Sequence, residues 1–422
     1  MKAFIEKSQP KGRITAPPSK SYTIRALMGA ALVRGESEII HPLVSEDTGA
    51  ARAVLGKIGV SISPQKDSWQ LGGGNFHEAE GELFCGESAA TLRFMTAICS
   101  LVPGKCRLTA APSLGRRPVE PLIRALRQLG VNASRQGETA PITVEGGGGL
   151  RGGTAELAGD ISSQFVSALL FIAPFAEDGL NIKITTPLQS KPFVLMTIDC
   201  LSKFGIKIAL SKELDEFKIT RQEYRPARYE VEGDWSSASY FLALGAISGG
   251  VEVANLNPES LQGDKIMLKF LPDMGAQVTV NLDSVMVKKS RLKAIRADLA
   301  DSIDLLPTMA VLAAVAEGTS ELTGIERAAI KESDRVAAVK EGLTRMGIAV
   351  TEARNKLTIT GSAPRGALIN SRGDHRIAMA FSLLGSLAGN TIIDGAECVA
   401  KTFPDFWDKL KSLGGRVKID GQ

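Results

Sequence analysis

Basic side chains lie at several predicted helix starts, where the partial positive charge of the helix dipole disfavours a cation. They lie in Arg117-Pro118, Ser190-Lys191-Pro192, Lys331-Glu332-Ser333-Asp334-Arg335 and Lys401-Thr402-Phe403-Pro404. Proline favours the first turn of a helix. A helix start attracts negative charge, so a cation there costs about 0.3–1 kcal/mol. Exposure to solvent would explain one such residue. Because the feature recurs, we expect these segments to bind an anion such as phosphate or carboxylate.

Three carboxylates lie among these cations and could move protons: Asp304, Glu332 and Asp374. Taken alone, the residues predict binding of a polyanionic small molecule and leave the reaction open. The five cysteines are scattered, and the three histidines form no ligand cluster. We therefore expect reduced thiols in a cytoplasmic protein, with no metal and no cofactor.

The composition of the 422 residues narrows the class of partner. The formal net charge is only +4 and aromatic residues make up 5%, which disfavours a nucleic-acid binder that stacks bases. The longest uncharged runs, residues 161–176 and 377–393, contain polar residues and are short for a membrane-spanning helix. We expect no nucleic-acid partner and no membrane.

A glycine recurs at nearly constant spacing and divides the chain into six units of about 70 residues. The glycines are Gly59, Gly130, Gly205, Gly275, Gly347 and Gly414. Each follows a helical pattern of apolar residues and precedes a strand pattern. A glycine just after the end of a helix, in the left-handed conformation, explains this transition.

A second helix, apolar on all sides and therefore buried, is predicted earlier in every unit. Each begins at a polar tip: Ser19-Lys20-Ser21, Glu87-Ser88, Ser162-Ser163-Gln164, Asp234 to Ser237, Asp301 to Asp304, or Asp374-His375-Arg376. A unit thus consists of a strand, the buried helix, a strand, an amphipathic helix, the glycine and two strands. The sixth unit stops after Arg416–Asp420, so we expect the strand Lys2–Glu6 to complete it.

Six such units exceed one ordinary core, so a division into three plus three is expected. The first lobe would comprise residues 18–230. The second would comprise residues 1–17 together with 231–422. The chain would cross twice between lobes, near residues 16–19 and 225–234, which predicts a hinged cleft that closes on a ligand. A cluster of like charges would hold the lobes apart until an anion binds.

The tips resemble those of the EPSP synthase family of 3-phosphoshikimate 1-carboxyvinyltransferases. The matching segments are Pro17-Pro18-Ser19-Lys20-Ser21 with Arg25, Ser162-Ser163-Gln164-Phe165, Val231-Glu232-Gly233-Asp234, Lys331 to Arg335, Asp374-His375-Arg376 and Lys401 to Asp405. They run in the family's order from near residue 17 to near residue 407. The resemblance implies a two-lobed inverse α/β barrel with three units in each lobe, in agreement with the six repeats.

The resemblance also implies a reaction: transfer of the enolpyruvyl group of phosphoenolpyruvate to the 5-hydroxyl of shikimate 3-phosphate, with release of phosphate. By resemblance, Asp304, Glu332 and Lys20 are catalytic. Shikimate 3-phosphate would bind Lys20, Ser21, Arg25, Ser162, Ser163, Gln164, Ser190, Asp304 and Lys331. Phosphoenolpyruvate would bind Lys20, Ala89, Arg117, Gln164, Arg335, Arg376 and Lys401. We expect a monomer without cofactor or metal.

Three segments depart from the family pattern. Phe193 replaces a tyrosine, Arg327 replaces an asparagine, and Ala89-Ala90 stands where most members have Gly-Thr after a small residue. The methyl group of Ala89 should project into the phosphoenolpyruvate site. The longer inhibitor glyphosate should clash with it, so we expect weak inhibition by glyphosate.

Three alternative functions are disfavoured by the sequence. A UDP-N-acetylglucosamine enolpyruvyl transferase typically opens with Lys-Asn and carries a cysteine on a mobile tip, whereas this chain has Lys20-Ser21 and no cysteine in residues 113–118. A non-catalytic two-lobed anion-binding protein would not need Asp304 and Glu332 together. An RNA-end-processing enzyme is disfavoured by the low basicity and the few aromatic residues.

Overall fold

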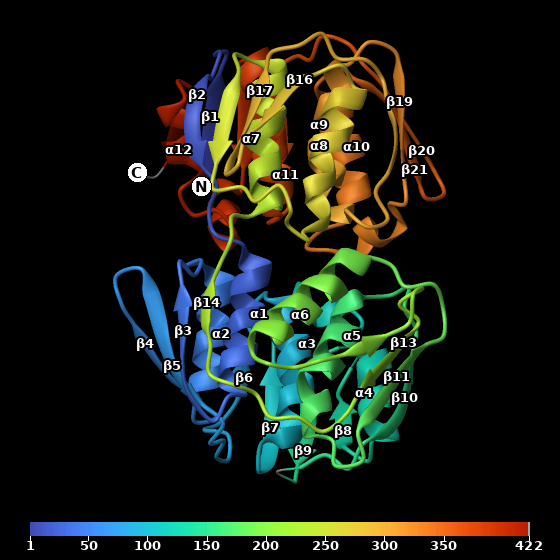
Figure 1. Cartoon of the computed structure of the whole chain (residues 1–422). Coiled ribbons are helices and arrows are strands. Elements are labelled where there is room, and N and C mark those ends of the chain that lie inside the picture. The colour runs from blue at the N-terminus through green and yellow to red at the C-terminus, as the bar shows by residue number, and fades with distance from the viewer. Residues whose placement is uncertain (138, 148, 421–422) are drawn as a thin grey trace. The chain divides into compact units, whose positions relative to one another are not determined.

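The computed structural model describes residues 1–137, 139–147 and 149–420, and the chain divides into two units (Figure 1). The unit Pro18–Glu232 holds the first three repeats and is called the first lobe. The unit formed by Met1–Pro17 and Gly233–Gln422 holds the other three and is called the second lobe. Each lobe has its own core of buried apolar side chains. Among the described residues, no helix combines the length and apolar character needed to span a membrane.

Each repeat forms one four-stranded sheet, and the third repeat shows the pattern. Strands β10 (Gly153–Leu157) and β11 (Leu180–Ile184) pair in parallel, with α5 (Ser163–Ile172) between them in the chain. After α6 (Lys191–Lys203), a hairpin of β12 (Ala209–Leu210) and β13 (Glu216–Ile219) adds β13 antiparallel to β11. The helix is the crossover that a parallel pair requires.

The remaining elements of the first lobe repeat this order. The first repeat contains α1 (Lys20–Ala31), β3 (Gly35–Ile40), α2 (Glu46–Gly56), β4 (Ser61–Pro64) and β5 (Ser68–Gly73). The second contains β6 (Leu83–Phe84), α3 (Ala89–Ile98), β7 (Gly104–Thr109), α4 (Glu120–Gln128), β8 (Asn132–Arg135) and β9 (Ile142–Gly146).

The second lobe has the same succession. The fourth repeat contains α7 (Trp235–Ile247), β15 (Val251–Ala254), α8 (Met267–Asp273), β16 (Gln277–Val280) and β17 (Ser284–Lys288). The fifth contains β18 (Arg296–Asp298), α9 (Leu306–Val315), β19 (Thr319–Thr323), α10 (Arg335–Arg345), β20 (Ala349–Ala353) and β21 (Lys356–Thr360). The sixth contains β22 (Leu368–Asn370), α11 (His375–Ala388), β23 (Thr391–Asp394), α12 (Phe406–Ser412) and β24 (Arg416–Asp420).

Three strands near the crossings complete sheets whose other strands lie far away in the chain. Strand β1 (Lys2–Glu6) lies between β23 and β24, which confirms that the N-terminal strand completes the sixth repeat. Strand β2 (Gly12–Thr15) pairs with β15 of the fourth repeat, and β14 (Arg228–Glu230) pairs with β3 of the first. The sequence pattern did not predict these last two exchanges. Each lobe is therefore closed by a strand from a crossing segment.

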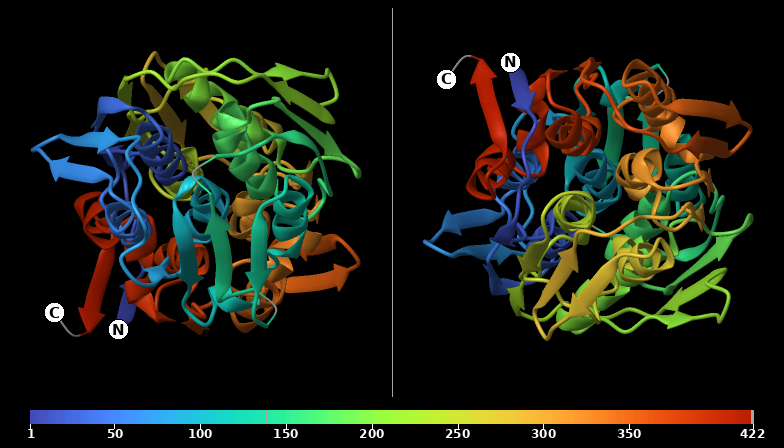
Figure 2. Two further views of the ribbon diagram at one scale, coloured as in Figure 1. Left: turned by 90° about the horizontal axis from the view of Figure 1, so that it is seen from below. Right: turned by 90° about the horizontal axis from the view of Figure 1, so that it is seen from above.

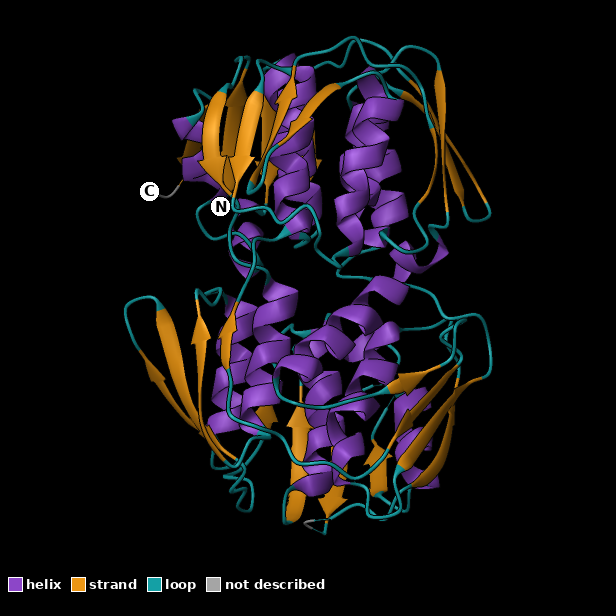
Figure 3. Ribbon diagram, viewed as in Figure 1, coloured by secondary structure: helices purple, strands orange, loops and turns teal. Residues whose placement is uncertain are grey.

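Within each lobe the buried helices lie inside and the sheets lie outside, as seen along the helices (Figure 2) and across them (Figure 3). The prediction of apolar helices is confirmed: in α7, for example, every residue except Ser236 is buried. The glycines that end the amphipathic helices have positive φ angles, from 80° at Gly130 to 103° at Gly59. This geometry favours glycine because a Cβ atom is disfavoured there. The arrangement brings the polar starts of the buried helices in each lobe to one end of its core.

Candidate active site

Most of the buried helices begin with a side-chain cap. The capping residues, which accept a hydrogen bond from a backbone N–H in the first turn, are Ser19, Ser88, Ser162, Asp234 and Asp374. Such a cap satisfies an amide group that a helix start leaves unpaired. Helix α9 differs, because the 3-10 helix Ile303–Leu305 precedes it and no side chain caps it. That 3-10 helix contains Asp304.

Predicted site residues of the first lobe, together with Arg93, lie around its helix starts, and we call this group the first-lobe tip cluster. Its members are Lys20, Ser21, Arg25, Ala89, Arg93, Arg117, Ser162, Ser163, Gln164 and Ser190. Arg93 joins three of the segments involved. Its Nη1 donates to Ser162 Oγ at 3.1 Å and to Gln164 Oε1 at 2.7 Å, and its Nη2 donates to the Pro118 carbonyl at 3.1 Å. Arg93, which had no assigned role, thus orients two residues that did.

Arg25 is 2% exposed and ties α1 to α6. Its Nε donates to Thr197 Oγ1 at 2.8 Å, and its two terminal nitrogens donate to the carbonyls of Ser21 and Phe193 at 3.0 and 2.9 Å. Burial lowers the pKa of Arg25 to about 10, so the side chain stays charged at neutral pH. These hydrogen-bond acceptors are all neutral, and the positive charge is therefore not cancelled by them.

Lys20 has a carboxylate partner that sequence reasoning missed. Its Nζ lies 2.8 Å from Asp47 Oδ2, and the two side chains are 19% and 10% exposed. Asp47 lies in the first turn of α2, just after the capping residue Ser45. An acidic residue is common in the first turn of a helix because it interacts favourably with the helix dipole. Only the packing of α1 beside α2 therefore identifies Asp47 as a partner of Lys20.

Other members of the cluster are closely confined. Ser190 has a left-handed backbone (φ 54°) directly before α6 and is 2% exposed. Arg117 is 7% exposed, and Ala89, the first residue of α3, is 8% exposed. Phe193, one of the departures from the family pattern, places its ring 5.7 Å from the guanidinium carbon of Arg25.

The prediction that basic residues begin the amphipathic helices is right for two tips and wrong for two. Lys191 and Arg335 are the first residues of α6 and α10. Arg117 instead follows the 3-10 helix Leu114–Arg116, before α4 begins at Glu120. Lys401 ends the 3-10 helix Ala396–Lys401, before α12 begins at Phe406. Because Arg117 and Lys401 lie before the first residues of α4 and α12 and outside these helices, the helix-dipole argument does not apply to them.

In the second lobe the structure brings seven residues into the second-lobe tip cluster: Asp304, Lys331, Glu332, Arg335, Asp374, Arg376 and Lys401. Asp304 is surrounded by cations. Its Oδ1 accepts from Arg335 Nη1 at 2.6 Å and lies 3.6 Å from Lys331 Nζ, and its Oδ2 accepts from Arg376 Nη2 at 3.2 Å. Arg376 also donates to the hydroxyl of Tyr240 at 3.4 Å.

Arg335 is the hub of this cluster and is 1% exposed. It donates to Asp304 and Glu332, and its Nε donates to Asp374 Oδ2 at 2.8 Å. Asp374, which is fully buried, also accepts from Ser333 Oγ at 3.0 Å and from the Arg376 amide at 2.9 Å. Asp374 therefore positions Arg335 and the start of α11, and is less suited to moving protons than the sequence suggested.

The surrounding charges and burial shift the pKa values of Asp304 and Lys331. Burial alone would raise the pKa of Asp304, but Arg376, Lys331 and Arg335 hold that pKa well below its ordinary value. Burial lowers the pKa of Lys331 to about 8, although Asp304 opposes the shift. At neutral pH Asp304 is a carboxylate and Lys331 is close to titrating.

The expected cluster of like charges is wrong for the second lobe. Lys331, Arg335 and Arg376 are balanced by Asp304, Glu332 and Asp374, as the hydrogen bonds and ion pairs above describe. Lys401 is the remaining cation and donates to the Gly373 carbonyl at 2.9 Å. Arg327, the other charged departure from the family pattern, donates to the Ala300 carbonyl at 2.6 Å. Repulsion from this cluster alone therefore gives no reason for an open cleft.

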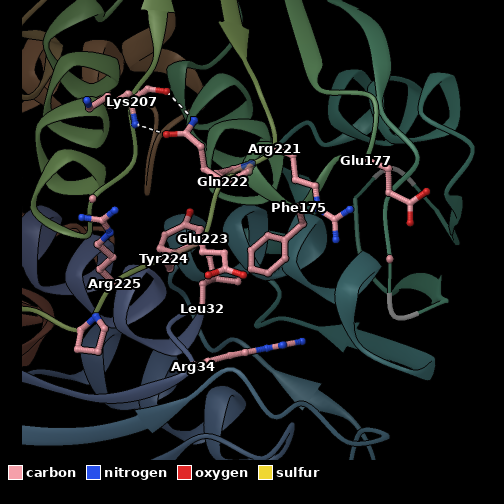
Figure 4. Close-up of a pocket in the computed structure, with 14 residues that line it drawn as sticks. Leu32, Arg34, Phe175, Glu177, Lys207, Arg221, Gln222, Glu223, Tyr224 and Arg225 are labelled. Carbon is pink, nitrogen blue, oxygen red and sulfur yellow. Dashed lines mark hydrogen bonds between the residues drawn. The ribbon is translucent and has the colours of Figure 1, made fainter.

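A cavity of about 1060 Å³ lies elsewhere in the first lobe (Figure 4). Its wall is braced by Gln222, whose side chain accepts from the Lys207 amide at 2.8 Å and donates to the Lys207 carbonyl at 2.9 Å. Tyr224, also in the wall, donates to the Phe171 carbonyl at 2.7 Å. No predicted site residue lines this cavity, so it does not bear on their assignment.

Comparison with known proteins identifies the fold and the family that these clusters match. The family model for EPSP synthase (3-phosphoshikimate 1-carboxyvinyltransferase) matches residues 5–410. A protein of Dehalococcoides mccartyi named 3-phosphoshikimate 1-carboxyvinyltransferase is 53% identical over all of both chains. One of the same name from Methanothermobacter thermautotrophicus is 41% identical, with 99% of this chain and all of that protein covered.

Solved structures agree with this. The structure of EPSP synthase from Acinetobacter baumannii superposes with a TM-score of 0.85 at 27% identity and covers 99% of each chain. The enolpyruvyl transferase NikO from Streptomyces tendae shares the fold, with a TM-score of 0.81 at 16% identity over 99% of this chain and 98% of that one. The two-lobed inverse α/β barrel expected from the resemblance is thereby confirmed.

Proposed function

This chain belongs to the EPSP synthase family, and from that premise we propose how its two tip clusters divide the work of the reaction. The protein is a transferase of the shikimate pathway. It moves the enolpyruvyl group of phosphoenolpyruvate to the 5-hydroxyl of shikimate 3-phosphate and releases phosphate. The UDP-amino-sugar alternative is not favoured, because the family model and the named relatives all carry the shikimate activity.

The second-lobe tip cluster supplies the proton chemistry in this proposal. Asp304 accepts the proton of the attacking hydroxyl, and Glu332 handles the proton at the methylene carbon, with Lys20 as a further catalytic residue. The observation that carries the proposal is the position of the Asp304 carboxylate between Arg335, Arg376 and Lys331. These groups keep Asp304 ionised, which a proton acceptor requires.

The same contacts suggest how Asp304 becomes a stronger base when substrate binds. Arg335 and Arg376 are assigned to phosphoenolpyruvate, whose carboxylate and phosphate suit the planar guanidinium fork. When these arginines turn part of their donors to the substrate, Asp304 loses stabilising hydrogen bonds, and its pKa rises towards its ordinary value. Substrate binding would thus activate the base. Arg117, Lys401, Gln164, Lys20 and Ala89 complete the proposed phosphoenolpyruvate set.

The first-lobe tip cluster contributes mainly binding in this proposal. Lys20, Ser21, Arg25, Ser162, Ser163, Gln164 and Ser190 are assigned to shikimate 3-phosphate, together with Asp304 and Lys331. Hydroxyl groups and cations are suitable donors to a phosphate and to sugar-like hydroxyls. Arg25 already uses each of its three nitrogens in an internal hydrogen bond, which favours an electrostatic role.

A phosphate-release assay tests the assignment. With phosphoenolpyruvate and shikimate 3-phosphate, the protein should release phosphate, and with UDP-N-acetylglucosamine as the acceptor it should not. Release only with the UDP-sugar would contradict the proposed function, and no release with either acceptor would favour a non-catalytic anion-binding protein. We further propose that the enzyme acts as a cytoplasmic monomer, which size-exclusion chromatography and cell fractionation would test.

A further inference from the structure

A chain of buried polar side chains joins the three helices of the first lobe that carry the proposed shikimate 3-phosphate residues. These helices are α1, α5 and α6 (Figure 1), and α6 packs against both of the others. The chain consists of Arg25 on α1, Thr197 on α6 and Ser167 on α5. Arg25 is 2% exposed, and the two hydroxyl residues are fully buried. Each member lies about one to two turns beyond the start of its helix, so the chain connects the helices just behind their binding ends.

Thr197 is the central member of this chain. Its Oγ1 accepts a hydrogen bond from Arg25 Nε at 2.8 Å and is a donor to Ser167 Oγ at 2.8 Å. It also lies 3.0 Å from the Phe193 carbonyl of the preceding turn, which accepts from Arg25 Nη2 at 2.9 Å. A threonine inside a helix commonly bonds back to its own preceding turn. The hydrogen bonds of Thr197 to α1 and α5 go beyond that local role.

The position of Arg25 depends on α6 more than on its own helix. Thr197 and the Phe193 carbonyl on α6 accept from two of its nitrogens, and the Ser21 carbonyl on α1 accepts from the third. The rings of Phe94 and Phe193 lie 5.5 and 5.7 Å from its guanidinium carbon. Loss of the Thr197 hydroxyl would leave a buried, charged donor without its acceptor, which is costly. Arg25 would then shift, or α6 would move to supply another acceptor.

We propose that Thr197, together with Ser167, is a positioning residue for the shikimate 3-phosphate site. It holds Arg25 and α5 against α6 and so sets the spacing of the three helix starts. The inference rests on the proposed assignment of those starts to shikimate 3-phosphate. A ligand that is bound by donors from several helices requires those donors to keep their mutual geometry closely. Thr197 acts through Arg25 and the helix starts, and it does not touch the substrate.

The KM for shikimate 3-phosphate should report this role. Thr197→Val keeps the branched shape and removes the hydroxyl, so that KM should rise about tenfold, as expected for loss of a hydrogen bond to a charged group. The kcat and the KM for phosphoenolpyruvate should stay near the parental values. Thr197→Ser restores the hydroxyl and should restore most of the affinity.

Thr96→Val is the matched control, because it makes the same change in the same lobe. Thr96 is fully buried on α3, and its hydroxyl donates to the Leu92 carbonyl of its own helix at 2.7 Å. Urea unfolding should show a loss of stability in both valine variants, whereas the KM for shikimate 3-phosphate should rise in Thr197→Val alone. A parental KM in Thr197→Val, or an equal rise in both variants, would overturn the proposal.

Nuclear magnetic resonance gives a readout that a general loss of stability would not move. The Nε–H signal of Arg25 should be protected from exchange with water in the parent, in Thr96→Val and in Thr197→Ser. In Thr197→Val the signal should shift and exchange faster, because its acceptor is gone. An unchanged signal in that variant would show that Thr197 does not hold Arg25.

Two further measurements keep the test decisive. Should Thr197→Val fail to fold, Ser167→Ala removes the α5 end of the chain and should raise the KM for shikimate 3-phosphate about threefold, the effect of one neutral hydrogen bond; an unchanged KM would overturn the proposal. Calorimetry with shikimate 3-phosphate separates this inference from the proposed function. No binding to the parent would contradict both, whereas equally tight binding to the parent and to Thr197→Val would contradict the role of Thr197 alone.

Discussion

The arginines of the two tip clusters differ in what they are bonded to. In the first lobe, Arg25 donates to hydroxyl and carbonyl oxygens, all of them neutral. In the second lobe, Arg335 and Arg376 donate mainly to carboxylates. Neutral acceptors fix a guanidinium in place and leave its charge available to a ligand.

Carboxylate acceptors have a different consequence. They cancel the charge, but they create groups whose pKa values change when a ligand draws the arginine away. In our proposal, the same helix-start architecture, repeated six times, thus yields an anion-binding surface in one lobe and a proton-handling cluster in the other. For these arginines, the difference lies in whether carboxylates or neutral groups occupy the positions that they contact.

The largest effect should come from removing the proposed base of the second lobe. Asp304→Asn keeps the shape and removes a proton acceptor, so kcat should fall by about 10²–10⁴-fold, while the KM values change little. Steady-state kinetics of the variant, with exposed Asp283→Asn as the control, measures this. Turnover at the parental rate would mean that the second lobe does not supply the base.

Stability should separate the two kinds of arginine. Arg335→Met leaves buried carboxylates without their partner and should cost about 3–5 kcal/mol of unfolding free energy. Arg25→Met leaves only neutral acceptors unsatisfied and should cost about 1–3 kcal/mol. Urea unfolding of both variants at pH 7 compares them. An equal or larger loss for Arg25→Met would contradict the distinction between the lobes.

The pH dependence of stability should reveal Asp264, a buried carboxyl group in the 3-10 helix Gly263–Ile266 of the second lobe. Burial raises its pKa from 3.8 to about 7, so its contribution is fully favourable below about pH 4 and is lost as the pH rises through 7. Asp264→Asn avoids that loss. The variant should therefore gain stability relative to the parent between pH 4 and 7, by at most about 4 kcal/mol, and the gain should level off above pH 7. Urea titrations at pH 5, 6 and 8 would measure it, and a difference independent of pH would refute the shifted pKa.

A smaller effect should appear at alkaline pH from Lys331, which has a pKa of about 8. As the pH rises through 8, the lysine loses its charge, and the KM for shikimate 3-phosphate should increase by about tenfold at one unit above that pKa. Lys331→Arg keeps the charge and should remove most of this increase, whereas Lys340→Arg on the surface of α10 should not. If all three proteins showed the same alkaline increase, Lys331 would not be the titrating group.

The smallest structural change concerns Ala89 at the start of α3 in the first lobe. Ala89→Gly removes one methyl group, should cost no more than about 1 kcal/mol of stability, and should increase glyphosate sensitivity far more than it changes the KM for phosphoenolpyruvate. Inhibition constants of the parent, Ala89→Gly and Ala90→Gly would decide. Strong inhibition of the parent would contradict the proposed clash, and an unchanged Ala89→Gly would point to Ala90 or Phe94.

Much of the fold was predictable because its signals are local. Six glycines with positive φ follow six amphipathic helices, and the buried helices are apolar on every side. Backbone conformation and burial of one face depend on residues a few positions apart, so a single sequence carries them. The residue types at the tips were visible for the same reason, and their order along the chain was sufficient to indicate the family.

The tertiary structure decided which side chains from distant parts of the chain contact one another. Arg335 meets Asp374 39 residues away, Arg93 meets Gln164 71 residues away, and Lys20 meets Asp47 27 residues away. The strands β14 and β2 join sheets of repeats to which they are not adjacent in sequence. No local pattern specifies such pairings, because they arise only when packed helices bring their starts together. The sequence alone therefore determined which charged groups stand at the tips, and the packing determined which of those charges are cancelled.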